Sequence, residues 1–76
     1  MVLPGVYRHY KGQQYEVLGV ARHSEKEEEF VIYRALYGDR GLWVRPLAMF
    51  TECVEKKGGF VPRFSRIEED TGKASG

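Results

Sequence analysis

The stretch FVIYRALYGDRGLWVRP, residues 30–46, decides the fold because it joins two apolar runs through a glycine-containing turn. Residues 30–37 are rich in β-branched and aromatic side chains, which are typical of a strand. GDRG at 38–41 can form a tight loop, since glycine accepts positive φ, and LWVR at 42–45 returns. The helix formers in EKEEE at 25–29 make a helix the competing interpretation. The apolar runs and the turn together favour a β-hairpin.

Further short β-type runs lie on both sides of this hairpin and are separated by turn residues. They are GVYRHY at 5–10, QYEVLGVARH at 14–23 and ECVEKKGGFVPRFSRI at 52–67, the last broken by KKGG. Gly19 marks a bend or bulge, and PLAMF at 46–50 fits one helical or 3₁₀ turn with Pro46 at its first position. We therefore predict a mainly β fold: a small SH3-like barrel of four to five antiparallel strands with one short helical or 3₁₀ turn before the last strand.

Chain length favours one small domain. We expect residues 1–67 to form a single β-barrel and residues 68–76, EEDTGKASG, to be a disordered acidic and polar tail. A chain of 76 residues buries only about 60% of the surface that its unfolded form exposes. A deep active site would therefore compete with the core for the same apolar side chains.

The single cysteine and the lack of a long apolar run predict a cytoplasmic protein. The single cysteine, Cys53, excludes an intramolecular disulfide, which favours a reducing compartment. The first residues, MVLPGVYRHY, lack the apolar stretch of a signal peptide. No run approaches the roughly 20 apolar residues that span a bilayer. We expect no membrane partner.

Charge is distributed unevenly although the net charge is only +1. Seven of the 11 acidic residues lie in EKEEE at 25–29 and EED at 68–70, which leaves the rest of the chain mildly basic. Charged loops usually face water and only keep a protein soluble. A basic face that binds a partner is the other interpretation.

The loop length of the hairpin predicts which side chains share a face. If GDRG is a four-residue loop, Tyr37 pairs with Leu42 and Arg34 pairs with Arg45. Arg34, Arg45 and Trp43 then lie on the face opposite the apolar core. A one-residue change in register would reverse this assignment.

A binding platform is one interpretation of this face. It consists of the Trp43 ring, the flanking Arg34 and Arg45, and Arg40 at the tip of the turn. A guanidinium group binds carboxylate or phosphate through two hydrogen bonds and stacks on aromatic rings. Such a surface suits an acidic peptide, an anionic ligand or a single nucleic-acid strand.

A purely structural role is the other interpretation. Trp43 would then pack under the turn at 46–50 or under the last strand, and an arginine would pair internally with Glu52 or Glu55.

Residues that commonly carry catalysis or bind metals form no pattern in this chain. His9 and His23 are the only histidines, and zinc requires three or four ligands at compatible spacing. If KGQ at 11–13 closes the first hairpin, His9 lies opposite Glu16, as a surface pair. Cys53 has no neighbouring group that would activate a thiol. No nucleophile elbow, phosphate loop or dinucleotide fingerprint occurs. We expect no catalytic residues, no metal, no cofactor and no enzymatic activity.

Four segments together resemble a known family: GVYRHYKG, YEVLGVARHSE, VIYRALYGDRGLWVRPLAMF and VPRF. The chain resembles the small bacterial family called domain of unknown function 1653 over residues 5–67. The matching motif positions are Tyr7, Tyr10, Gly12, Tyr15, His23, Ser24, Glu25, Tyr37, Gly38, Gly41, Trp43, Arg45 and Pro46. The resemblance implies a compact bacterial domain and carries no established activity or site residue.

These observations favour a non-enzymatic binding or interaction module whose partner is a protein, a peptide or an anionic ligand. A domain that binds single-stranded RNA is the alternative. A third hypothesis is an enzyme or regulatory subunit that needs a partner chain. An open strand edge at 5–10 or in the last segment would allow a weak homodimer; otherwise we expect a monomer.

Overall fold

The computed structural model describes residues 2–67, which contain seven strands and one short helix. The strands are β1 (Gly5–His9), β2 (Gln14–Arg22), β3 (Glu29–Ala35), β4 (Leu42–Pro46), β5 (Cys53–Lys56), β6 (Gly59–Pro62) and β7 (Phe64–Arg66), and the helix α1 spans Leu47–Phe50. The predicted tail at 68–76 lies outside the described residues.

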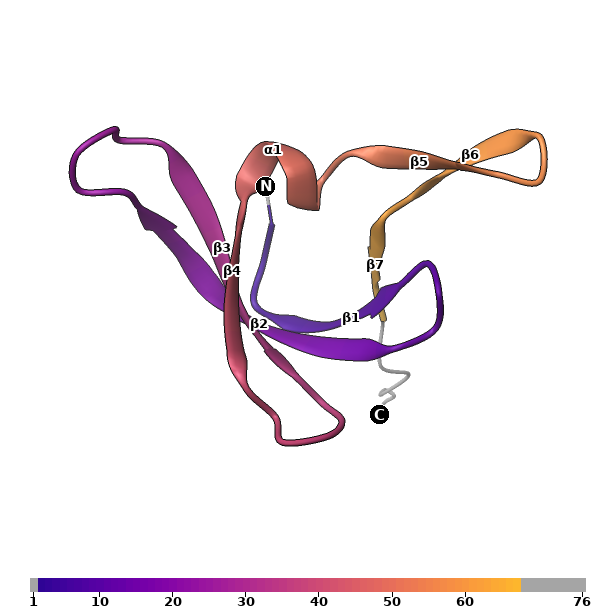
Figure 1. The fold of residues 1–76 in the computed structure, drawn as a ribbon, viewed down its shortest axis with the longest axis horizontal. Helices are drawn as coiled ribbons and strands as arrows, with labels where there is room; N and C mark the ends of the chain where they lie inside the picture. Colours follow the sequence, from indigo (N-terminus) through magenta and orange to yellow (C-terminus); the bar gives the residue numbers. More distant parts are fainter. Residues whose placement is uncertain (1, 68–76) are drawn as a thin grey trace, which may run out of the picture.

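Five strands form one antiparallel sheet in the order β4-β3-β2-β1-β7, and β5 pairs only with β6 in a separate hairpin. Figure 1 shows that the sheet is strongly bent and that the β5–β6 hairpin extends away from it. The prediction of a mainly β fold with one helical turn is confirmed. The described strands number seven rather than four to five, because the predicted last strand is divided into β5, β6 and β7. β4 and β7 are the two edges of the sheet and are not paired with each other, so the described strands do not close into a barrel.

The connection between β3 and β4 is longer than the predicted loop. β3 ends at Ala35, so residues 36–41 all belong to the connection. Gly38 and Arg40 both have left-handed backbones, with φ of 59° and 57°. The Asp39 carboxylate accepts a hydrogen bond of 3.2 Å from the backbone N–H two residues further on. The longer connection changes the register of β4 against β3.

The register of the β3–β4 hairpin therefore differs from the predicted one. Tyr33 pairs with Trp43, and Val31 pairs with Arg45. Compared with the predicted pairing, β4 is displaced along β3 by an odd number of residues. The side chains of β4 therefore lie on the face opposite to the predicted one. Trp43 and Arg45 lie on the face of the buried residues Val31 and Tyr33, which we call the inner face. Arg34 lies on the opposite, outer face.

The first hairpin also has a wider turn than predicted. Glu16 pairs with Val6, so the expected pair of His9 with Glu16 is wrong. The turn includes Tyr10 as well as KGQ, and this places His9 on the inner face. The His9 ring lies 4.7 Å from the Tyr10 ring and 5.0 Å from the Phe64 ring, between ring centroids.

Three predicted interruptions of the strands are confirmed. The β2–β3 register shifts between Val17 and Gly19, so Leu18 is the extra residue of a bulge that bends β2. Pro46 ends the β4 ladder and stands immediately before α1 rather than as its first residue. The break at KKGG is a tight turn in which Lys57 and Gly58 have φ of 53° and 85°.

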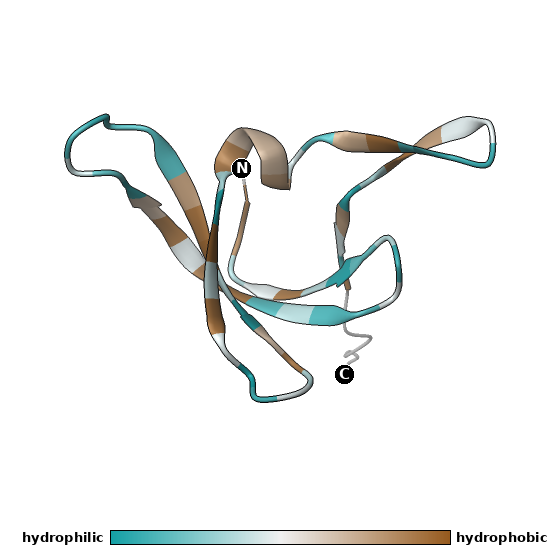
Figure 2. Ribbon diagram, viewed as in Figure 1, coloured by the Kyte–Doolittle hydropathy of each residue, from teal (hydrophilic) through white to brown (hydrophobic). Residues whose placement is uncertain are grey.

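The core is small and mainly aromatic. Its buried members are Tyr7, Val17, Val31, Tyr33, Phe50 and Phe64. Phe50 of α1 stacks on Phe64 of β7, with ring centroids 4.1 Å apart and planes at 5°. This stack ties the helical turn to one edge of the bent sheet. Figure 2 shows apolar segments, in brown, on α1 and on the strands that face it.

Candidate functional site

The structure separates the residues that the sequence grouped into one platform. Trp43 and Arg45 share the inner face, whereas Arg34 lies on the outer face opposite Leu42. Arg40 lies in the connection at 36–41, away from the paired residues of the strands. The predicted platform therefore reduces to Trp43 and Arg45.

Trp43 is exposed on this face. Its residue is 58% accessible to solvent, so the interpretation of a tryptophan packed under α1 is wrong. Phe50 occupies the core position in α1 and is only 2% exposed. Keeping an indole ring in water sacrifices apolar burial, which makes Trp43 a candidate contact residue.

Trp43 and Arg45 border a hollow of about 250 Å³ on the inner face. We call it the inner hollow, and its lining residues are Tyr15, Tyr33, Tyr37, Trp43 and Arg45. Arg45 Nε donates a hydrogen bond of 3.3 Å to the Tyr33 hydroxyl. Its guanidinium carbon lies 5.8 Å from the centre of the Phe64 ring, within the range of a cation–π contact. These contacts orient the guanidinium group without neutralising it.

The positive charge of Arg45 also acts on its neighbours. Burial lowers the pKa of His9, and the charges of Arg45, Arg63 and Lys11 lower it further. His9 Nδ1 accepts a hydrogen bond of 3.2 Å from the Lys11 backbone N–H. The inner face therefore favours negative charge over additional positive charge.

Three tyrosines line the inner hollow, and the sequence reasoning did not include them in the site. The hydroxyls of Tyr15 and Tyr37 lie 2.7 Å apart, within hydrogen-bond distance. The Tyr15 ring also contacts the Tyr33 ring edge to face, with centroids 5.4 Å apart. Strand alternation could have placed Tyr15 and Tyr33 on one face, but Tyr37 lies in a loop and has no such signal.

Tyr15 should titrate at unusually high pH. Burial, and after it the hydrogen bond with Tyr37, together raise its pKa from the usual 10.0 to about 12. Because the folded pKa lies above the unfolded one, the stabilisation is complete below pH 10 and is lost as pH rises toward 12. We expect Tyr37→Phe to lower the pKa of Tyr15, measured by NMR of ring-labelled tyrosine. An unchanged Tyr15 titration would show that the two hydroxyls do not interact.

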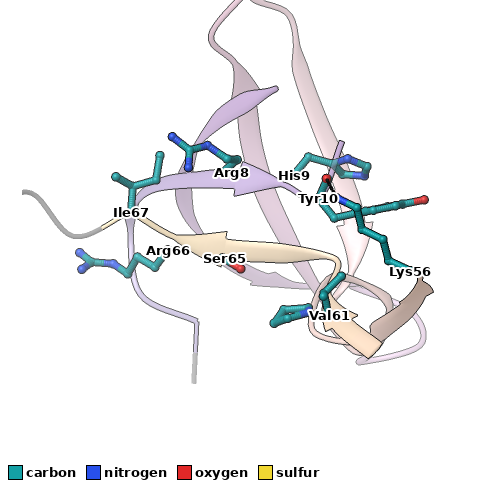
Figure 3. Close-up of a pocket in the computed structure, with 9 residues that line it drawn as sticks. Arg8, His9, Tyr10, Lys56, Val61, Ser65, Arg66 and Ile67 are labelled. Atoms are coloured by element: carbon teal, nitrogen blue, oxygen red, sulfur yellow. Dashed lines mark hydrogen bonds between the residues drawn. The ribbon is translucent and has the colours of Figure 1, made fainter. Parts of the chain in front are cut away.

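A second hollow, of about 310 Å³, lies between β1, β7 and the β5–β6 hairpin. It is lined by Arg8, His9, Tyr10, Lys56, Val61, Pro62, Ser65, Arg66 and Ile67. In Figure 3, Arg8 and Arg66 extend away from Lys56 instead of converging on one point. Lys56 Nζ donates to the Tyr10 carbonyl at 3.3 Å. This hollow is basic, but its cations are poorly placed to hold one anion together.

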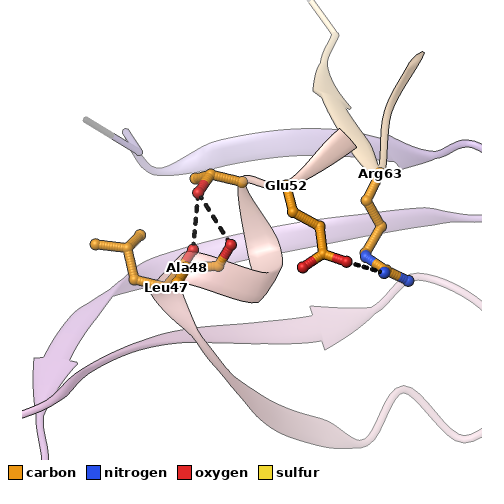
Figure 4. Close-up of polar contacts among 5 residues, drawn as sticks. Leu47, Ala48, Glu52 and Arg63 are labelled. Carbon is orange, nitrogen blue, oxygen red and sulfur yellow. Dashed lines mark hydrogen bonds and ion pairs between the residues drawn. The ribbon is translucent and has the colours of Figure 1, made fainter. Parts of the chain in front are cut away.

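The predicted internal partner of the arginines is already occupied. Glu52 Oε2 pairs with Arg63 Nη2 at 2.6 Å, beside the end of α1 (Figure 4). Among residues 2–67 this is the only ion pair between side chains. Arg34 and Arg45 therefore do not pair with Glu52 or Glu55 in the described part of the chain.

Comparison with known proteins agrees with the motifs seen in the sequence. The model of a family described as a protein of unknown function, DUF1653, matches residues 5–66. The chain belongs to the DUF1653 family. It is 42% identical to a DUF1653 protein from Bordetella bronchiseptica whose crystal structure is known, with 92% of each chain covered and a TM-score of 0.81. A search of curated proteins gives no match.

The other residues of this DUF1653 protein that were considered as catalytic or metal-binding groups are a histidine, His23, and a cysteine, Cys53. His23 Nδ1 accepts hydrogen bonds from the backbone N–H groups of Glu25, at 3.1 Å, and Lys26, at 3.2 Å, and so holds the acidic loop. Cys53 is exposed. Within residues 2–67, no group of three His, Cys, Asp or Glu side chains could hold a metal ion. No helix in that range is long and apolar enough to cross a membrane.

Proposed function

We propose that this DUF1653 protein is a non-enzymatic binding module whose inner hollow receives a carboxylate from an acidic segment of another protein. The observation that carries the proposal is the unpaired charge of Arg45 among the described residues. Its guanidinium has no carboxylate partner among residues 2–67, and it borders a hollow that also exposes Trp43. A hydrogen bond to a charged group contributes about 1.5–3 kcal/mol, so a carboxylate is the preferred occupant.

The size of the inner hollow supports a side chain as the ligand. Its volume of about 250 Å³ is below the roughly 300–1,000 Å³ typical of pockets for whole small molecules. The hydroxyl groups of Tyr15 and Tyr37 can donate to or accept from a bound group. The flat Trp43 ring can cover the apolar stem of that group.

An SH3-like barrel, a bacterial source and a cytoplasmic setting belong to the same proposal. The strands are short, the sheet is bent, and the helical turn precedes the last strands. In a small β-domain of this kind, an exposed aromatic face is a suitable place for a partner segment.

A peptide titration tests the proposal. Binding is followed by the fluorescence of Trp43, which is the only tryptophan of the chain. The probe is the capped peptide TVEVEVT, and its matched control is TVQVQVT. We expect Arg45→Gln to weaken binding of the acidic peptide by about tenfold or more, since 1.4 kcal/mol corresponds to a factor of ten. Arg34→Gln removes the same charge from the outer face and should change the affinity little. Equal losses in the two variants would contradict the role of the inner hollow.

Single-stranded RNA is the alternative ligand, and the exposed Trp43 ring supports it because bases stack on aromatic side chains. The same titration with a short oligouridine separates the two proposals. Binding to phosphates weakens steeply as salt rises, whereas a peptide held by one carboxylate contact and by apolar contacts changes less. Tighter binding of oligouridine with a steep salt dependence would favour the alternative.

A further inference from the structure

The edge of β4 offers unpaired backbone groups. β4 is at the end of the sheet and pairs with β3 alone among the described strands. The Gly41 carbonyl accepts a hydrogen bond of 3.1 Å from the Ala35 N–H, which fixes which residues bond toward β3. Because such bonds alternate along an antiparallel ladder, the peptide groups of Leu42 and Val44 face outward.

The side chains of this edge are large, apolar and exposed. Leu42 and Val44 are each 61% exposed, and Trp43 is 58% exposed. Figure 2 shows the apolar residues along β4. Natural proteins protect such edges with charges, prolines or a covering segment. In β4 the single charge, Arg45, and the single proline, Pro46, both stand at the end of the strand. A free, apolar edge is suited to receive another strand.

The two faces beside this edge have different chemistry. The inner face has Arg45 and Trp43 on β4, at the inner hollow. The outer face has a second depression of about 220 Å³ beside Val44, which we call the outer hollow. It is lined mainly by apolar groups, from Ala21, Arg22, His23, Phe30, Ile32 and Val44. An occupant of the outer hollow should therefore be apolar, and an occupant of the inner hollow should be acidic.

We propose that the partner segment binds as an added strand on the free edge of β4, with acidic side chains on the inner face and apolar side chains on the outer face. A strand alternates its side chains between two faces, so one alternating segment satisfies both hollows. This inference rests on the proposed function and specifies how the acidic segment is held. The outward peptide groups of Leu42 and Val44 supply its main-chain hydrogen bonds.

Charge favours a different protein over a second copy of this chain as the partner. β4 itself, LWVRP, contains Arg45 and no acidic residue. A second copy of β4 would therefore place no acidic side chain opposite Arg45 in any register. Arg40 adds positive charge two residues before β4 begins. An acidic segment is complementary to it.

Amide exchange followed by NMR tests the strand addition. With the peptide TVEVEVT at about 100 times its Kd, exchange at Leu42 and Val44 should slow by about 100-fold, because only the free protein exchanges. The amides of Trp43 and Arg45 already face β3 and serve as internal controls. If adding the peptide did not change the fluorescence of Trp43, the proposed function would be contradicted. A fluorescence response without protection at Leu42 and Val44 would overturn the strand addition alone.

N-methylated peptides give the matched control. Only one edge of an added strand faces β4, so methylating one alternating set of amides should abolish protection while methylating the other set should not. Equal tolerance of both sets would overturn the proposal. Protection that appears without peptide and increases with protein concentration would also overturn it, in favour of a homodimer.

Discussion

Replacing Phe50 by alanine is expected to lower the free energy of unfolding by about 3–5 kcal/mol. Phe50 is 2% exposed and stacks on Phe64 at 4.1 Å, and its ring centroid lies 5.6 Å from that of Tyr7. In a domain of this size a single core rarely supplies more than about 3–5 kcal/mol, so the variant should be close to unfolded at 25 °C. Urea denaturation followed by far-ultraviolet circular dichroism measures the loss.

Met49 provides the matched control because it precedes Phe50 in the same helical turn and is 43% exposed. We expect Met49→Ala to change the unfolding free energy by only about 0.5 kcal/mol, as is usual for surface positions. Because alanine has the highest helix propensity, helix propensity does not explain a loss in either variant. A similar loss in the two variants would show that burial does not distinguish Phe50 from Met49. The core position of Phe50 would then be wrong.

Local sequence chemistry was sufficient to predict where the strands break. Gly19 removes a side chain within β2, and the bulge lies next to it. Pro46 has no N–H to donate, so the β4 ladder ends there and α1 follows. Lys57 and Gly58 take the left-handed backbone that a two-residue hairpin turn requires. Each of these outcomes depends on a few adjacent residues.

Register could not be predicted in the same way because it depends on the full length of each connection. Arg40 takes a left-handed backbone that its residue type does not favour, and the β3–β4 connection includes Leu36 and Tyr37. The odd shift in register placed Arg34 on the opposite face from Trp43 and Arg45.

The candidate site was therefore predicted only in part. Trp43 and Arg45 were singled out by residue type, and the structure keeps them together. Tyr15 and Tyr37 were missed because their contact joins residues of two different hairpins. Contacts of this kind follow from the bend of the whole sheet rather than from any short pattern.

The second large effect is expected at Gly5, where alanine should cost about 1–3 kcal/mol of stability. Gly5 has φ of 142°, a conformation that residues with a side chain rarely adopt. An added Cβ would also lie 2.8 Å from Arg66 Nη2. Arg66 could move away, but it would then lose its hydrogen bond of 3.1 Å to the Pro4 carbonyl. Urea denaturation measures the combined cost.

Two further variants separate the backbone conformation from the contact. Gly19→Ala is the matched control, since Gly19 has no positive φ and an added Cβ meets nothing within 4 Å. Measuring Gly5→Ala in an Arg66→Ala background removes the crowding but leaves the backbone unchanged. Because the guanidinium is at the end of a flexible side chain, we expect most of the loss to remain in that background. If Arg66→Ala abolished the loss, crowding rather than φ would explain why glycine is needed where β1 begins.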